Sequence, residues 1–193
     1  MRRIVLLAVL ALALPVAAFA DNSFDFSNLG GSLSISSSGV TLSGSKLQGV
    51  NGLGYGDVTG SNLGSVDFST GALMSTSGQI STFAGGGSFV IGSNGTGGLS
   101  SGTLFNGSFT GNVTVKEKNN GYFLLTGNIS GTARLANGNW VTIHAATVQL
   151  RSGAKGQVSG DTAGVVPEPG TLGLLGTGLL GMAGLVRRKM RAH

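Results

Sequence analysis

The sequence predicts an all-β protein, most economically an antiparallel β-sandwich or flattened barrel with Gly/Ser-rich turns. Three observations predict this class. Glycine accounts for 36 of the 193 residues and charged residues for only 10%, whereas globular domains average about 7% glycine and about 25% charged residues. Apolar residues alternate with Ser and Thr over short stretches, which is the period of a half-buried strand. Gly-Gly, Ser-Gly and Asn-Gly steps separate these stretches and indicate turns.

The first twenty residues, taken as a separate segment 1–20, have the three-part layout of a secretory signal peptide. Two arginines precede an apolar run that is shorter than the roughly 20 residues of a membrane-spanning helix. The flanking residues of a twin-arginine signal are missing, so general secretion and a signal peptidase are the expected partners. No cysteine follows the site, which argues against a lipoprotein anchor. Cleavage is predicted between Ala20 and Asp21, after a site formed by the small residues Ala18 and Ala20.

Residues 21–166 form the predicted β domain. Its first half contains small, sparse apolar residues in alternation, which predict short strands and a thin core: Leu33, Ile35, Val40, Leu42, Val66 and Phe68. Its second half predicts stronger strands over residues 88–92, 107–115, 121–135 and 139–150. Asn137-Gly138 predicts a two-residue hairpin, and the polar segment 116–121 predicts another connection between paired strands. In chain order these strands read as an antiparallel meander.

A faint internal echo leaves a second fold open. Thr110 to Thr114 (TGNVT) is repeated as Thr126 to Ser130 (TGNIS), sixteen residues later. One interpretation is a β-solenoid rung. The interpretation we favour is that two neighbouring strands have similar composition, because only two copies exist.

The charges of this domain exclude one class of partner. Six basic residues (Lys46, Lys116, Lys118, Arg134, Arg151, Lys155) balance six acidic residues (Asp21, Asp25, Asp57, Asp67, Glu117, Asp161). The formal net charge of +5 therefore comes from the two ends of the chain. Nucleic-acid binding needs Lys and Arg clustered on the domain itself, so no nucleic-acid partner is expected.

Catalytic and metal-binding patterns are weak. The absence of cysteine excludes disulfides, zinc-thiolate sites and a cysteine nucleophile. The acidic residues stand singly, so we expect no metal and no cofactor. His144 is predicted to share one strand face with Trp140 and Thr142, as an exposed strand histidine rather than a catalytic base. Tyr55, Tyr122 and Trp140 are candidates for stacking on sugar rings. The sequence predicts a protein that is not an enzyme.

Residues 167–193 read PEPGTLGLLGTGLLGMAGLVRRKMRAH, a second tripartite signal. Its motif is Pro167, Glu168 and Pro169, whose prolines favour extended backbone. An apolar segment and four cations follow. This order at the C-terminus resembles the PEP-CTERM sorting tail of Gram-negative bacteria, also called the ice-binding protein C-terminal domain. The resemblance implies an exosortase-type membrane protease as partner, with release or transfer of the protein to the cell surface.

The apolar segment, residues 171–186, predicts a short membrane helix. As a helix it would be about 24 Å long against a hydrocarbon core of about 30 Å, so we expect a transient anchor in the inner membrane. Small residues spaced by four form a potential packing face: Gly173, Thr177 and Gly181. The stop-transfer cluster that should remain cytoplasmic is Arg187, Arg188, Lys189 and Arg191.

The leading functional hypothesis is an exported, non-enzymatic surface or matrix protein associated with exopolysaccharide and biofilm. The resemblance of the tail carries this link, because such tails occur in polysaccharide-producing bacteria. A glycan- or ice-binding module is the alternative, supported by the hydroxyl-rich composition, although regular Thr-x-Thr rungs are missing. A secreted hydrolase acting through His144 is the third hypothesis.

Overall fold

The computed structural model describes residues 23–118, 121–153 and 158–166, which belong to one compact unit. The predicted signal helix and C-terminal hydrophobic helix lie outside these residues. The described chain contains twelve strands: β1 (Ser23–Leu29), β2 (Ser32–Ser36), β3 (Gly39–Asn51), β4 (Asp57–Ser69), β5 (Leu73–Ser77), β6 (Ile80–Phe83), β7 (Gly86–Ser93), β8 (Gly102–Phe109), β9 (Val113–Lys118), β10 (Tyr122–Arg134), β11 (Trp140–Ser152) and β12 (Val158–Val165). None of the described segments is a helix with the length and hydropathy needed to cross a membrane.

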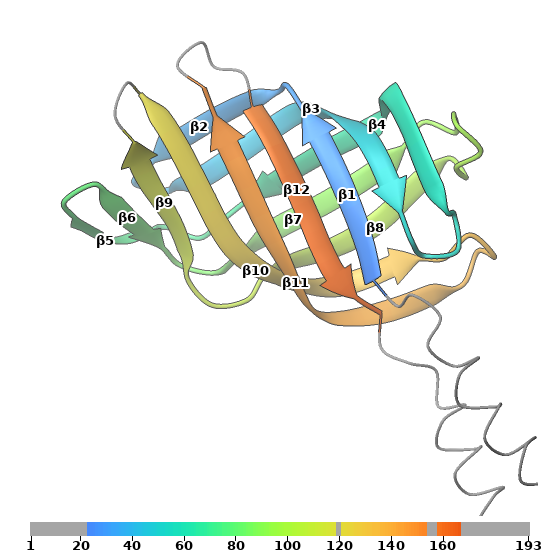
Figure 1. The fold of residues 1–193 in the computed structure, drawn as a ribbon. Helices are drawn as coiled ribbons and strands as arrows, with labels where there is room; N and C mark the ends of the chain where they lie inside the picture. Colours follow the sequence, from blue (N-terminus) through green and yellow to red (C-terminus); the bar gives the residue numbers. More distant parts are fainter. Residues whose placement is uncertain (1–22, 119–120, 154–157, 167–193) are drawn as a thin grey trace, which may run out of the picture. The chain divides into compact units, whose positions relative to one another are not determined.

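Eight of these strands close into an antiparallel barrel (Figure 1). In the order β1, β3, β4, β7, β8, β10, β11 and β12, each strand pairs with the next, and β12 returns to pair with β1. The predicted all-β class and the antiparallel meander are confirmed. Closure pairs the backbone N–H and C=O groups that the edge strands of an open sheet would leave unpaired.

The remaining strands extend the walls at one end of the barrel. The short strand β2 pairs with β3, while β9 pairs with β10, β6 with β9, and β5 with β6. The β-solenoid alternative is wrong, because all pairings between described strands are antiparallel. The echoed segments are neighbours instead: Thr114 of β9 faces Thr126 of β10.

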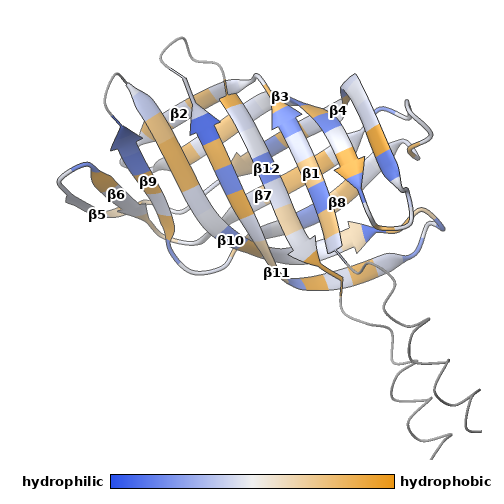
Figure 2. Ribbon diagram, in the orientation of Figure 1, coloured by the Kyte–Doolittle hydropathy of each residue, from blue (hydrophilic) through white to orange (hydrophobic). Residues whose placement is uncertain are grey.

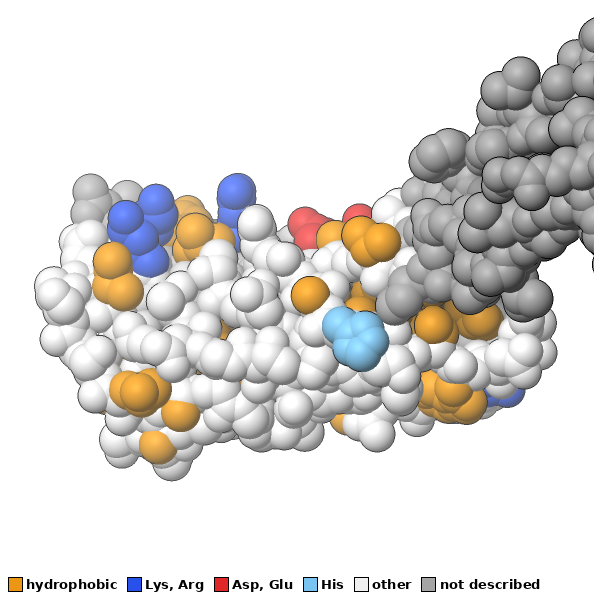
Figure 3. All heavy atoms as spheres, turned by 90° about the horizontal axis from the view of Figure 1, so that it is seen from below, with side chains coloured by type: hydrophobic (Ala, Val, Ile, Leu, Met, Phe, Trp, Pro, Cys, Tyr) orange, Lys and Arg blue, Asp and Glu red, His pale blue; other side chains and the backbone are white. Residues whose placement is uncertain are grey.

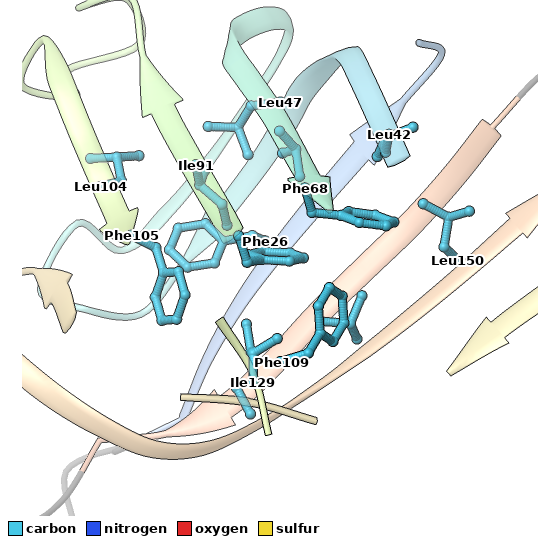
Figure 4. Packing of buried hydrophobic residues seen from close by; sticks show 14 of the residues in the cluster. Phe26, Leu42, Leu47, Phe68, Ile91, Leu104, Phe105, Phe109, Ile129 and Leu150 are labelled. Atoms are coloured by element: carbon cyan, nitrogen blue, oxygen red, sulfur yellow. The ribbon is translucent and has the colours of Figure 1, made fainter. Parts of the chain in front are cut away.

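The core lies inside the barrel, where alternate residues of opposite walls meet. Hydrophobic residues alternate with polar or small ones along the long strands (Figure 2). Phe89 of β7 lies at the centre of an aromatic group, with ring centroids 5.6 Å from Phe68, 5.9 Å from Phe105 and 5.7 Å from Phe109. Figure 4 shows Phe26, Phe105, Phe109 and Ile129 directed into the space between the walls. The interior is therefore packed with side chains.

The expectation of a thin core in the first half is wrong. Phe24 and Phe26 of β1 are fully buried, as are Leu42 and Leu47 of β3. Both β3 and β4 are 13 residues long, so the sparse apolar residues are spread over long strands. Leu33 and Ile35, which the alternation also selected, lie on β2, where Ile35 is 38% exposed.

Two local predictions are also corrected. The predicted strand 107–115 is two strands, because the chain turns at Gly111, whose φ of 75° lies in the left-handed region. The hairpin at Asn137-Gly138 exists, but three residues rather than two lie between the bonded Leu135 and Asn139. A two-residue type I′ turn needs positive φ at both central residues, and only Gly138 (φ 86°) adopts it.

Candidate ligand-binding site

The outer face of β9, β10 and β11 gathers basic residues that are far apart in the sequence. Leu124 of β10 faces Lys116 of β9 on one side and Arg151 of β11 on the other. One step further along, Tyr122 faces Lys118. Neighbouring strands lie about 4.8 Å apart, so the backbones of Lys116 and Arg151 are about 10 Å apart. Figure 3 shows Lys and Arg gathered at one end of the barrel.

A hollow of about 340 Å³ lies beside this row. Tyr122, which is 47% exposed, offers an aromatic ring, while two cations offer hydrogen-bond donors. The lining consists of Lys118, Tyr122, Phe123, Leu124, Arg151 and Ser152. Arg presents a planar fork of donors that matches a carboxylate, and Lys presents a compact charge. This combination suits a ligand with an apolar ring face and a negative group.

Hydroxyl and amide groups continue the same face toward the middle of the strands. Thr114 and Thr126 share a hydrogen bond of 2.7 Å between their Oγ1 atoms. Gln149 of β11 faces Thr126 from the other side. These groups both donate and accept hydrogen bonds, so the surface next to the hollow is suited to sugar hydroxyls.

A β-bulge orients Arg151 toward this face. Near the Asn137-Gly138 turn, Thr132 faces Thr142, but beyond the bulge Ile129 faces Ala146. Ser130 therefore stands opposite two residues, His144 and Ala145. The extra residue shifts the pairing by one, and in a strand a one-residue shift exchanges the two faces. Arg151 consequently faces Leu124 on the outside, while Leu150 faces the buried Leu125.

Two carboxylates occupy the outer face further round the barrel. Partial burial raises the pKa of Asp25, and the negative charge of the nearby Asp161 raises it further, while a hydrogen bond from the Phe26 backbone opposes the shift. Asp161 faces Gln149 of β11 and Ser27 of β1. These two carboxylates are thus separated from the cations along the outer face, while Glu117 of β9 faces Phe123 at the hollow. Lys116, Lys118 and Arg151 still outnumber Glu117 at this end.

A second hollow, of about 450 Å³, lies on the wall formed by β4, β7 and β8. Its lining is polar and glycine-rich: Asn62, Gly64, Ser65, Gly92, Ser93, Asn94, Gly102 and Thr103. The lining includes neither a charged nor an aromatic side chain to orient a ligand. It is therefore the weaker candidate, although its volume is larger.

His144 lies on the outer face, exposed, together with Trp140 and Thr142, as the alternation predicted. No hydrogen bond joins its side chain to a described carboxylate or serine. Within residues 23–118, 121–153 and 158–166, no three His, Cys, Asp or Glu residues are grouped to hold a metal ion. In that same part of the chain, every buried side-chain N or O atom has a hydrogen-bond partner.

The residues predicted for export and sorting lie outside the described residues. These are the cleavage-site residues Ala18, Ala20 and Asp21, the motif Pro167, Glu168 and Pro169, the small-residue face and the basic cluster. They remain predictions from the sequence. The hollow was missed because its cations are scattered in the sequence. The predicted connection over residues 116–121 is also too long, because residues 116–118 belong to β9 and Lys118 faces Tyr122.

Comparison with known proteins identifies the tail. Residues 165–189 match the model of the PEP-CTERM protein-sorting motif, whereas no curated protein and no solved structure matches the chain. The motif supports export, a transient stay at the membrane and processing by an exosortase-type membrane protease. Its first residue, Val165, is also the last residue of β12, so the sorting motif begins within the barrel wall.

Proposed function

We propose that this protein is a non-enzymatic component of the cell surface or extracellular matrix that binds an acidic exopolysaccharide. The observation that carries the proposal is the hollow in which Tyr122 lies beside Lys118 and Arg151. Export by the sorting tail delivers the barrel to the place where such polymers occur. The domain otherwise has balanced charges, so the local excess of positive charge is specific to this end.

A uronic-acid residue fits these groups. Its carboxylate accepts hydrogen bonds from the Arg151 guanidinium and the Lys118 ammonium, and charge-assisted bonds are about twice as strong as neutral ones. Its ring lies against Tyr122, because tyrosine combines an apolar face with a polar tip. Its hydroxyls, or those of the next sugar, reach Thr114, Thr126 and Gln149.

The site is open and shallow, so each sugar unit binds weakly. A polymer carries many such units, and many copies of the protein meet one polymer. Avidity then exceeds single-site affinity by a factor on the order of 10²–10⁴ without new contacts. Weak individual sites are thus sufficient for retention in a matrix.

Binding of the full chain to alginate, an acidic polymer, and to dextran, a neutral one, tests the proposal. We expect retention on alginate, weakening with salt because screening reduces exposed charge interactions. The double variant Lys118→Gln/Arg151→Gln should lose at least about tenfold in affinity, as expected when two charge-assisted hydrogen bonds are removed. Lys46→Gln is the matched control, because Lys46 is an exposed cation on β3, away from the hollow.

Equal binding to both polymers, or unchanged alginate binding by the double variant, would overturn the proposal. A Tyr122→Ala variant separates stacking from charge. It should weaken alginate binding while leaving the salt dependence of the remaining binding unchanged.

Ice binding is the second candidate, and cross-strand threonines favour it. Thr114 faces Thr126, and Thr132 faces Thr142, on the outer surface of the barrel. A thermal-hysteresis assay on the full chain tests this candidate. A blank result, together with retention on alginate, would leave the acidic-glycan proposal alone.

The non-enzymatic part of the proposal concerns His144. Its exposed position on a strand, without a hydrogen-bonded carboxylate among the described residues, lacks the usual support of a general base. Any polysaccharide cleavage by the purified protein that is abolished by His144→Ala would contradict this part.

A further inference from the structure

The two chain connections leave the barrel at one rim. Ser23, the first residue of β1, and Val165, the last of β12, are antiparallel partners. Val166 still packs against the hydrophobic core. The predicted membrane segment begins at Thr171, so five residue steps separate it from Val166. At no more than about 3.5 Å per residue, the tether reaches about 18 Å.

Two turns at this rim are joined by hydrogen bonds. Leu53, in the turn between β3 and β4, is buried with φ 54°. Its carbonyl accepts a hydrogen bond of 3.0 Å from the amide of Ala136, in the turn between β10 and β11. The Tyr55 hydroxyl donates to the Leu135 carbonyl at 3.3 Å. The two turns are thereby joined across the rim.

Exposed apolar side chains lie on the same rim. Trp140, the first residue of β11, is 51% exposed, and Val165 is 63% exposed. Arg134 faces Trp140 across β10 and β11. Tryptophan with a neighbouring cation is typical of protein surfaces at the level of lipid head groups.

The candidate glycan site lies at the opposite end of these strands. Arg151 faces Ser159, near the start of β12, six residues from Val165. At about 3.3 Å per residue, the hollow is about 20 Å further from the rim along the strand. A rim held against the membrane would therefore direct the hollow outward.

We propose that the rim formed by residues 52–56, 135–140 and Val165 is apposed to the lipid surface while the sorting tail is anchored, with Trp140 at the level of the head groups. The short tether keeps this rim near the bilayer, and the exposed Trp140 and Val165 make contact with it favourable. The Lys118–Tyr122–Arg151 hollow then faces away from the membrane. This orientation rests on anchoring by the tail and not on glycan binding.

Trp140 is the only tryptophan of the chain, so its fluorescence reports this surface directly. The full-length chain is reconstituted into vesicles of phosphatidylethanolamine and phosphatidylglycerol that carry a head-group nitroxide lipid, and the floated fraction is measured. A matched variant, Trp140→Phe/Tyr122→Trp, moves the reporter to the hollow. Circular dichroism and thermal unfolding establish that both chains are folded.

We expect the quenching of Trp140 to exceed that of the reporter at position 122 by roughly threefold or more, as for an aromatic ring at the interface. Equal quenching, or stronger quenching at position 122, would overturn the proposal, and so would the absence of chain from the floated fraction. Adding Lys118→Gln/Arg151→Gln to the otherwise native chain leaves the expected quenching of Trp140 unchanged, even if it abolishes alginate binding. Failure of the orientation and failure of the glycan proposal are therefore distinguishable.

Discussion

Ser23 and Val165 face each other as antiparallel partners, and this pair lies at one end of the barrel seam. The seam is formed by β12, which pairs with β1 on one side and with β11 on the other. A strand inserted between two others satisfies its backbone groups on both edges, and its loss leaves two open edges. The same strand carries the first residue of the sorting motif.

The first prediction concerns this seam. A chain covering residues 21–166 should unfold cooperatively, with the same midpoint as the chain that carries its tail, because Val166 is the last described residue packed against the core. A chain that also lacks residues 158–166 should lose the cooperative transition, because the barrel cannot close. Thermal unfolding followed by circular dichroism distinguishes the two chains. A cooperative transition in the shorter chain would contradict the requirement for β12 in closing the barrel.

The second prediction concerns Phe89, whose ring contacts those of Phe68, Phe105 and Phe109. Its side chain is fully buried. Phe89→Ala should lower the free energy of unfolding by about 3–5 kcal/mol, through lost burial and the cavity left behind. Urea denaturation measures the loss. Met74→Ala is the control, since Met74 is 60% exposed on β5 and its truncation should change stability by less than about 0.5 kcal/mol.

The third prediction concerns a buried polar pair between β1 and β3. The Asn28 Nδ2 donates to the Ser45 Oγ at 2.7 Å, and both residues are buried. Ser45→Ala removes the acceptor and leaves the buried side-chain amide of Asn28 without this hydrogen bond. The free energy of unfolding should fall by about 1–3 kcal/mol. Ser43→Ala, two residues away on the exposed face of β3, should be nearly neutral in the same denaturation assay. Equal losses for the two variants would refute this role of the pair.

The predictability of the fold differed between strands for a physical reason. In β10 and β11 most inward residues are apolar, among them Leu125, Ile129, Ile143 and Val148, so alternation in the sequence marks the strands. In β12 two of the inward positions are Gly160 and Gly164, because the space inside is filled by Asn28 and Phe24 of β1. A side chain at either glycine would collide with these neighbours. In β12 the inward residues differ from the outward ones in size more than in hydrophobicity. The sequence pattern therefore did not predict β12.

The candidate site depended on information that the sequence does not display. Lys116 and Lys118 lie beside β10 because β9 extends to Lys118, whereas the polar pattern predicted a connection over residues 116–121. Arg151 joins them only because of the bulge at Ser130. Without that one-residue shift Leu124 would face residue 150 instead. Bulge positions depend on how strands bend in the closed barrel, so alternation alone could not place Arg151.

The fourth prediction concerns the pH dependence of stability. Partial burial and the charge of Asp161 raise the pKa of Asp25 in the folded state, relative to about 3.9 in the unfolded chain. The folded state therefore binds this proton more tightly than the unfolded state. The resulting stabilisation is fully present below the unfolded pKa and is lost as pH rises through the folded pKa.

Asp25→Asn removes this effect. Its free energy of unfolding at pH 7 should exceed that of the native chain by less than about 1 kcal/mol, because the side chain is largely exposed. The difference should vanish near pH 3. Thermal unfolding between pH 3 and pH 7 measures it, with Asp57→Asn as a control for loss of an exposed carboxylate on β4. A destabilised Asp25→Asn at pH 7 would argue that the carboxylate is held by favourable contacts instead.

The fifth prediction concerns a glycine pair at which β8 and β10 approach closely. Gly107 faces Gly131 directly, next to the bulge at Ser130. A Cβ atom at Gly107 would overlap the Ser130 carbonyl oxygen, and one at Gly131 would overlap the Asn106 carbonyl oxygen. Backbone atoms cannot move aside as a flexible side chain can. Gly131→Ala should therefore lower the free energy of unfolding by about 1–3 kcal/mol through overpacking.

Gly98→Ala is the comparison. A Cβ atom there meets no atom within 4 Å, but the residue needs a positive φ of 82°, so the loss should be only about 1 kcal/mol. Urea denaturation of the two variants separates crowding from backbone conformation. If Gly131→Ala is as stable as the native chain, the close approach of the two strands is not a constraint on the barrel wall.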